Sequence, residues 1–136
     1  MSDPGHVMIR ASAGSGKTHA LTNRYLALLA RGAEPERIVA LTFTRKAAGE
    51  FFDRILRALA EAAADPAAAR RLGDETLGPA DYLRLLRRMI VAMPRLRLGT
   101  LDGFFSRIVR AFALELGLAG DFELLQDHAA RRERRR

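Results

Sequence analysis

The residues best suited to chemistry lie at 11–18, where the sequence reads Ala-Ser-Ala-Gly-Ser-Gly-Lys-Thr. This stretch follows a predicted strand at residues 6–11 and opens a predicted helix at residues 17–31, which is the context of a phosphate-binding loop. Glycines let backbone N–H groups converge on an anion at a helix N-terminus. Lys17 would bind the β- and γ-phosphates, and the Thr18 hydroxyl would bind Mg²⁺. The predicted nucleotide ligands are Ala11, Ser12, Ala13, Gly14, Ser15, Gly16, Lys17 and Thr18.

A second cluster of polar and aromatic residues follows the apolar run Ile-Val-Ala-Leu-Thr-Phe at residues 38–43. This run predicts a strand covered on both faces, and Thr44 can cap the helix that follows. Residues 42–46 would then lie at the carboxyl end of a parallel strand, the usual ligand edge. An aromatic ring beside hydroxyls and cations suits single-stranded nucleic acid. The residue types fit equally well a buried Phe43 beside solvated cations.

The elements that must position these residues alternate between strands and helices. Helix breaks are expected near Asp65-Pro66 and Gly78-Pro79, and Pro94 ends a helix that starts at Tyr82. Further strands are expected at residues 96–99 and 122–125. This order predicts an α/β fold with a parallel sheet of three to four strands flanked by helices. A last helix at residues 101–116 should turn five side chains inward: Phe104, Phe105, Ile108, Val109 and Phe112.

Composition limits the class of protein. The 136 residues suit one domain, 49% of them are hydrophobic, and the lack of cysteine excludes disulfides and thiolate metal sites. A surplus of 23 Lys+Arg over 16 Asp+Glu gives a net charge of +7, which favours a polyanionic partner. The sequence shows neither a signal peptide nor an apolar run long enough to span a membrane, so we expect a cytoplasmic protein and no membrane partner.

Three segments together resemble the UvrD/Rep-like superfamily-one DNA helicases, in the branch of the RecB and AddA helicase–nucleases. Residues 11–18 resemble motif I, with alanine in place of the first glycine. Residues 41–50 (Leu-Thr-Phe-Thr-Arg-Lys-Ala-Ala-Gly-Glu) resemble motif Ia, usually Thr-Phe-Thr-Asn-Lys-Ala-Ala-x-Glu. Residues 98–105 (Leu-Gly-Thr-Leu-Asp-Gly-Phe-Phe) resemble the later Gly-Thr-hydrophobic-His-Ser-Phe motif. The segments occur in the family's order.

The resemblance implies a partial RecA-like P-loop domain at residues 1–126, followed by an Arg-rich start of a truncated helix at residues 127–136. It implies ATP and Mg²⁺ as cofactors and single-stranded DNA as partner. Arg45 replaces the usual asparagine and still permits a phosphate contact. Asp102 replaces a frequent histidine, so capping of the last helix is an alternative role for it. The implied DNA contacts are Phe43, Thr44, Arg45, Thr100, Asp102 and Phe104, with His19 and Arg24 as candidates for adenine recognition.

The resemblance also implies missing parts, because the sequence holds no Asp-Glu motif and no second motor domain. We therefore expect the N-terminal portion of a larger ATP-dependent helicase or helicase–nuclease in DNA repair or recombination, with a nuclease protein as a further partner. The chain alone should be marginally stable or self-associating, bind ATP weakly and lack hydrolysis. Two alternatives stay open: a small P-loop kinase with residues 84–88 in its lid, and a non-enzymatic Arg-rich nucleic-acid-binding module.

Overall fold

The computed structural model describes Gly5, residues 16–72 and residues 76–118. The predicted strands at 6–11 and 122–125, the loop residues 11–15 and the Arg-rich residues 127–136 lie outside the described residues. The elements in chain order are α1 (Lys17–Ala30), η1 (Pro35–Arg37), β1 (Val39–Thr42), α2 (Arg45–Ala64), α3 (Pro66–Arg71), α4 (Pro79–Ala92), η2 (Met93–Arg95), β2 (Arg97–Thr100) and α5 (Leu101–Ala111).

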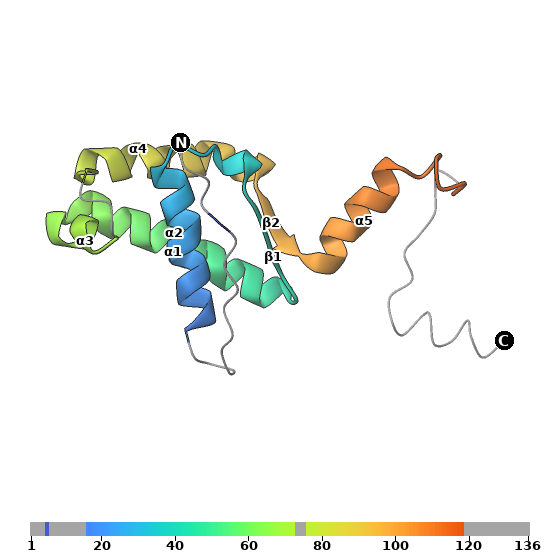
Figure 1. The fold of residues 1–136 in the computed structure, drawn as a ribbon, viewed down its shortest axis with the longest axis horizontal. Coiled ribbons are helices and arrows are strands. Elements are labelled where there is room, and N and C mark those ends of the chain that lie inside the picture. The colour runs from blue at the N-terminus through green and yellow to red at the C-terminus, as the bar shows by residue number, and fades with distance from the viewer. Residues whose placement is uncertain (1–4, 6–15, 73–75, 119–136) are drawn as a thin grey trace.

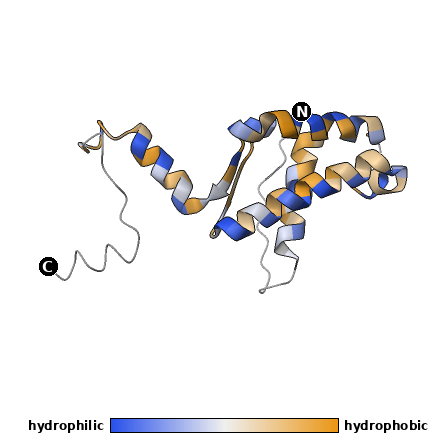
Figure 2. Cartoon of the chain, turned by 180° about the vertical axis from the view of Figure 1, so that it is seen from behind, coloured by the Kyte–Doolittle hydropathy of each residue, from blue (hydrophilic) through white to orange (hydrophobic). Residues whose placement is uncertain are grey.

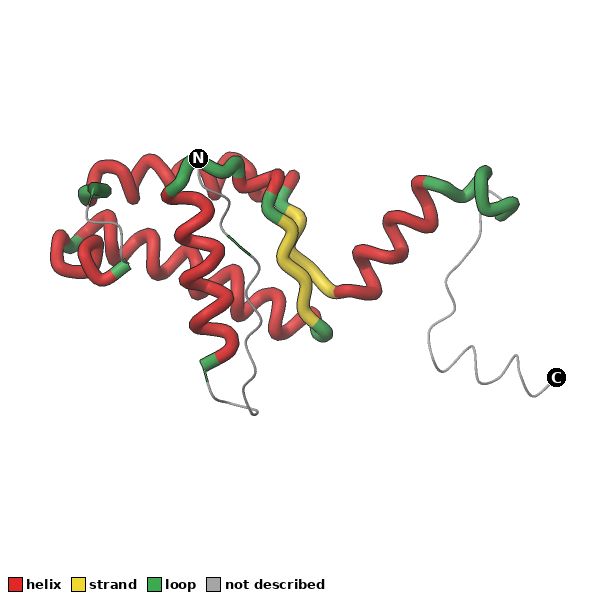
Figure 3. Tube along the Cα trace, in the orientation of Figure 1, coloured by secondary structure: helices red, strands yellow, loops and turns green. Residues whose placement is uncertain are grey.

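Two parallel strands form the sheet within the described residues (Figure 3). The register pairs Val39 with Arg97 at one end and Thr42 with Thr100 at the other. The α/β class and the parallel pairing are confirmed, whereas the strands expected at residues 6–11 and 122–125 lie outside the described residues.

The 3-10 turns η1 and η2 precede the two strands and are joined by an ion pair. Arg95 donates hydrogen bonds to Glu36, with Nη2 at 2.9 Å from the carboxylate oxygen. The pKa of Glu36 lies below its ordinary value, through a backbone hydrogen bond and the bond from Arg95. This pair links the entrances of the two strands.

The core lies between the helices and not within the sheet. Helix α2 packs against α4, and α1 packs against α2 (Figure 1). The rings of Tyr25 in α1 and Phe51 in α2 meet edge to face, with centroids 5.7 Å apart. The largest fully buried side chains come from α1, α2 and α4: Leu29, Phe51, Ile55, Leu59, Tyr82 and Met89.

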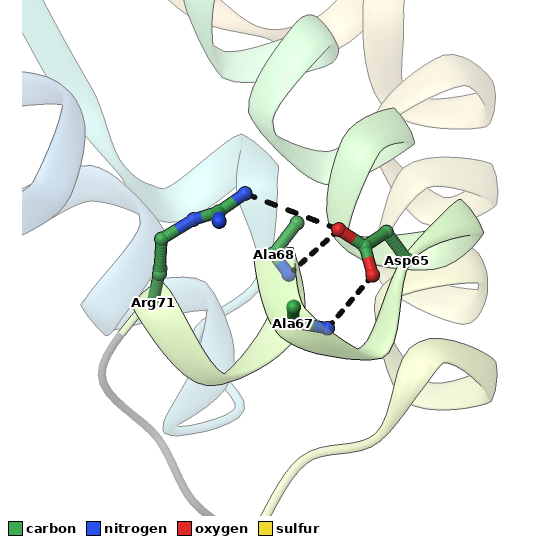
Figure 4. Close-up of polar contacts among 4 residues, drawn as sticks. All are labelled: Asp65, Ala67, Ala68 and Arg71. Carbon is green, nitrogen blue, oxygen red and sulfur yellow. Dashed lines mark hydrogen bonds and ion pairs between the residues drawn. The ribbon is translucent and has the colours of Figure 1, made fainter.

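The helix break at Asp65-Pro66 agrees with the sequence, whereas the start of α4 differs from it. The break near Asp65-Pro66 is confirmed, because Asp65 ends α2 and its carboxylate accepts hydrogen bonds from the N–H groups of Ala67 and Ala68 at 2.9 and 3.3 Å (Figure 4). Helix α4 begins at Pro79, three residues before the expected start at Tyr82, because proline suits the first position of a helix. It ends at Ala92, two residues before Pro94.

Two expectations about burial are wrong. Strand β1 is not covered on both faces: Val39 is 43% exposed, because the packing against the described strands comes mainly from α2, which contacts both. Helix α5 does not turn an apolar face inward, since it has no buried residue and ends at Ala111. Phe105, Ile108 and Phe112 are exposed. The helix extends away from the rest of the described chain, so its alternating apolar and polar residues meet no facing element (Figure 2).

Within residues 16–72 and 76–118, the longest and most apolar helices still fall short of what crossing a lipid bilayer requires.

Candidate functional site

The start of α1 contains the described part of the predicted phosphate-binding loop. Gly16 precedes the helix with φ of +81°, a left-handed conformation that favours glycine, and its carbonyl accepts a hydrogen bond from the Ala20 N–H at 3.0 Å. No side chain caps this helix start among the described residues. The N–H groups of its first turn therefore suit an anion, and the exposed Thr18 side chain lies on the same turn. Ala11, Ser12, Ala13, Gly14 and Ser15 lie outside the described residues, and for Lys17 only the backbone is described.

The two candidates for adenine recognition lie on α1 beyond this turn. The His19 ring nitrogen Nδ1 is 3.3 Å from Nδ2 of Asn23. Arg24 donates a hydrogen bond to the Gly5 carbonyl at 2.7 Å. These contacts occupy both side chains in the structure, and their part in adenine recognition stays a prediction.

The second and third motif segments meet at the carboxyl edge of the sheet. The register that pairs Thr42 with Thr100 brings the ends of β1 and β2 together, and a helix begins directly after each strand. Thr44 caps α2 by accepting a hydrogen bond from the Ala47 N–H, and Thr100 caps α5 by accepting one from the Gly103 N–H, both at 3.1 Å. Two segments that are far apart in the sequence thus end in the same way, with a threonine that caps the following helix.

The side chains at this edge differ in exposure. Phe43 is 88% exposed, so the interpretation of Phe43 as a core residue is wrong. Thr44 and Arg45 are exposed, whereas Thr100 is half-buried. Phe104 is half-buried against the ring of Phe105, with centroids 6.0 Å apart.

Asp102 lies in the first turn of α5 and is exposed. The capping role considered for it is taken by Thr100, whose hydroxyl accepts the hydrogen bond. A carboxylate in the first turn is still favourable, because the N-terminus of a helix carries partial positive charge.

Two residues of this edge were not singled out as contacts from the sequence. The Thr42 hydroxyl lies 2.9 Å from the Thr44 carbonyl oxygen and 3.4 Å from the Gly99 carbonyl oxygen. Gly103 leaves room for the α5 cap, since a Cβ there would lie 3.1 Å from the Thr100 hydroxyl. For Thr42, the sequence signal was a threonine near the end of a predicted strand. For Gly103, no sequence pattern indicated that a Cβ would come this close to Thr100.

The start of α1 and the carboxyl ends of both strands lie toward the same side of the molecule, the lower side of Figures 1 and 3. The segments that resemble nucleotide- and DNA-binding motifs therefore share one side. Within the described ranges, no three His, Asp or Glu side chains are grouped as a metal site would require.

Comparison of the sequence with known proteins shows the family. Residues 2–135 match the UvrD/REP helicase N-terminal domain. The chain belongs to this helicase family. It is similar to proteins named as a subunit of an ATP-dependent helicase/nuclease: 33% identical over 122 residues in Streptococcus suis, 32% in Streptococcus agalactiae and 30% in Streptococcus mutans. Each alignment covers 90% of this chain and 9% of the relative.

Membership of the UvrD/REP family confirms the resemblance drawn from the three motif segments, all of which fall inside the matched range. The chain spans about 9% of the length of these curated relatives.

Proposed function

We propose that this chain binds Mg²⁺·ATP at the start of α1 and single-stranded DNA at the carboxyl edge of the sheet, as part of an ATP-dependent DNA helicase–nuclease. The observation that supports this most directly is the pairing of Thr42 with Thr100, which joins two motif segments at one edge. The relatives named as helicase/nuclease subunits support the same assignment. Their names also support a longer polypeptide and a partner protein.

The start of α1 fits a nucleotide triphosphate. The left-handed Gly16 and the first-turn N–H groups without a side-chain cap suit phosphate oxygens, and Thr18 offers a hydroxyl to the metal. Bound Mg²⁺·ATP would supply the phosphoanhydride whose hydrolysis drives a helicase. The residues of this chain would hold and orient the phosphates, with Lys17 as the cationic partner.

The edge of the sheet fits a single strand of DNA. The exposed Phe43 ring offers a stacking surface for a base, and the exposed Arg45 offers a cation for a phosphate. The hydroxyls of Thr44 and Thr100 already accept backbone hydrogen bonds and keep their protons to donate to phosphate oxygens. Phe104 adds a second, half-buried ring. Asp102 would repel phosphate, so we assign it to the helix start instead.

The kinase alternative receives no support from helix α4. Its Arg84 and Arg87 are exposed, but Tyr82, Leu85 and Met89 of the same helix are buried in the core. The helix also lies on the upper side of Figure 1, away from the start of α1. A lid must move over the nucleotide, which a helix held in the core cannot do.

Equilibrium binding of a fluorescent ATP analogue and of labelled oligodeoxythymidylate tests the proposal. Lys17→Ala should abolish nucleotide binding and leave DNA binding unchanged. Phe43→Ala should weaken DNA binding by about 5- to 100-fold, the loss of one stacked base. Unchanged nucleotide binding by Lys17→Ala would contradict the nucleotide site.

Arg45→Ala tests the phosphate contact. The slope of log affinity against log salt should fall by about 1 for this variant. Arg57→Ala is the matched control, because Arg57 is also an exposed arginine of α2. Arg57 lies further along the helix than the edge of the sheet, and its Nη2 is 3.3 Å from the Asp53 carboxylate. Equal salt slopes for the two variants would show that Arg45 makes no phosphate contact.

A further inference from the structure

The turn between β1 and α2 consists of Phe43 and Thr44, and it exposes an aromatic ring almost completely. Burial of an aromatic ring is favourable, so a ring held in solvent needs a backbone that keeps it there. An apolar pocket of about 260 Å³ lies beside the first turns of α2, lined by Ala48, Gly49, Phe52, Met93, Leu96 and Leu98. The first two turns of α2, which directly follow Phe43 and Thr44, therefore carry an apolar surface on which a released ring could pack.

The hydrogen bonds of this turn centre on the Thr42 hydroxyl. A threonine hydroxyl has a single proton to donate, and the Thr44 carbonyl at 2.9 Å is its nearer acceptor. The same carbonyl accepts the Ala48 N–H at 3.1 Å, the first hydrogen bond of α2. The Gly99 carbonyl of β2 lies 3.4 Å from the hydroxyl. One hydroxyl thus joins the end of β1 to the first turn of α2 and lies against β2.

We propose that Thr42 is a positioning residue for Phe43: its hydroxyl holds the two-residue turn in the geometry that directs the ring into solvent at the sheet edge. The backbone on both sides of Phe43 is fixed by this bond, because the donor is the preceding residue and the acceptor is the following one. The inference rests on the proposed function in one respect, which is that the exposed ring stacks on a DNA base.

A fluorescent reporter tests this positioning without DNA. The chain contains no tryptophan, so Phe43→Trp places a single indole at the turn. Thr42→Val removes the hydroxyl and keeps the side chain at nearly the same shape. Loss of the hydrogen bond should raise the ratio of packed to exposed indole by about two- to tenfold. Acrylamide quenching of the indole should therefore fall. Thr42→Ser restores the hydroxyl and should restore the quenching.

Thr22→Val is the matched control. The Thr22 hydroxyl also donates to a nearby backbone carbonyl, that of Thr18 at 2.8 Å, but it lies in α1. This variant should leave quenching of the indole unchanged. The proposal is overturned if Thr42→Val leaves quenching unchanged, if Thr42→Ser behaves like Thr42→Val, or if Thr22→Val lowers quenching as much as Thr42→Val does.

A double-mutant cycle with oligodeoxythymidylate then separates positioning from general loosening. Thr42→Val should weaken DNA binding in the original chain and have no further effect in the Phe43→Ala background. Additive losses would overturn the positioning role. If the original chain binds no oligodeoxythymidylate, the proposed function fails, and the quenching experiment still decides whether Thr42 positions the ring.

Discussion

At the scale of single residues, the fold changes the acid–base chemistry of Tyr25 in α1. Its side chain is 2% exposed, and its hydroxyl donates to the Met89 sulfur at 3.8 Å. Burial, with a smaller contribution from the negative charge of Glu36, raises the pKa of Tyr25 from 10.0 to about 12. The neutral phenol is therefore favoured in the folded chain.

This shift predicts a loss of stability in alkali. Since the folded pKa is raised, the contribution of Tyr25 is complete below pH 10 and is lost as pH rises through about 12. The free energy of unfolding should fall on the order of 2 kcal/mol across this range through Tyr25 alone. Urea unfolding at several alkaline pH values should show a shallower decline for Tyr25→Phe. Parallel pH profiles for the two proteins would contradict the shift.

At the scale of elements, side-chain caps at the helix starts turn the chain from one element to the next. Thr44 and Thr100 lead from strands into helices, and Asp65 leads from α2 into α3. Each cap satisfies backbone N–H groups that have no partner inside the helix. The directions in which α2 and α5 leave the sheet edge therefore depend on two threonine hydroxyls.

The cap at Asp65 gives a direct test. Asp65→Ala removes the acceptor for both the Ala67 and Ala68 N–H groups and should lower the free energy of unfolding by about 1 kcal/mol. Asp65→Asn retains an acceptor and should lose less. Arg71→Ala is a further control, because its ion pair with Asp65 is exposed and 4.0 Å long, and such pairs contribute little (Figure 4). If Arg71→Ala costs as much as Asp65→Ala in urea unfolding, the ion pair and not the cap holds the junction.

At the scale of the whole molecule, the described chain combines a helical core with an unpartnered helix. Helices α1, α2 and α4 bury their largest side chains together, whereas Phe105 and Phe112 at α5 are 53% and 54% exposed. A contiguous apolar face of this kind favours association. From the sequence we expected self-association through the open edge and face of the sheet. The exposed apolar side chains of α5 add a second surface that could associate.

Sedimentation velocity tests the contribution of α5. The sedimentation coefficient of the 136-residue chain should rise with concentration, and replacing Phe105 and Phe112 together by glutamine should reduce that rise. Arg107→Gln, which changes an exposed polar residue of the same helix, should leave it unchanged. A concentration-independent coefficient for the original chain would show that the α5 face does not associate.

Much of the fold follows from local rules, so the sequence predicted it. Proline at 66 marks the start of α3, and threonine at 44 marks a helix cap, because each acts on its own few residues. Helix α4 begins at Pro79, three residues before the start that the sequence predicted. The pattern of three motif segments also identified the family. The exposure of Phe43 was not decided by residue type, since an aromatic residue after an apolar strand fits the core equally well.

The sequence by itself determined the helix break at Asp65-Pro66, the family and the identity of the candidate binding residues. Only the tertiary structure decided that Thr42 lies beside Thr100, that Phe43 is exposed and that α5 leaves the core. These features depend on contacts between segments far apart in the chain, such as Thr42 and Gly99, which are 57 residues apart. Local preferences specify which residues can form such contacts, but the packing of α2 against the sheet and α4 decides which of them form.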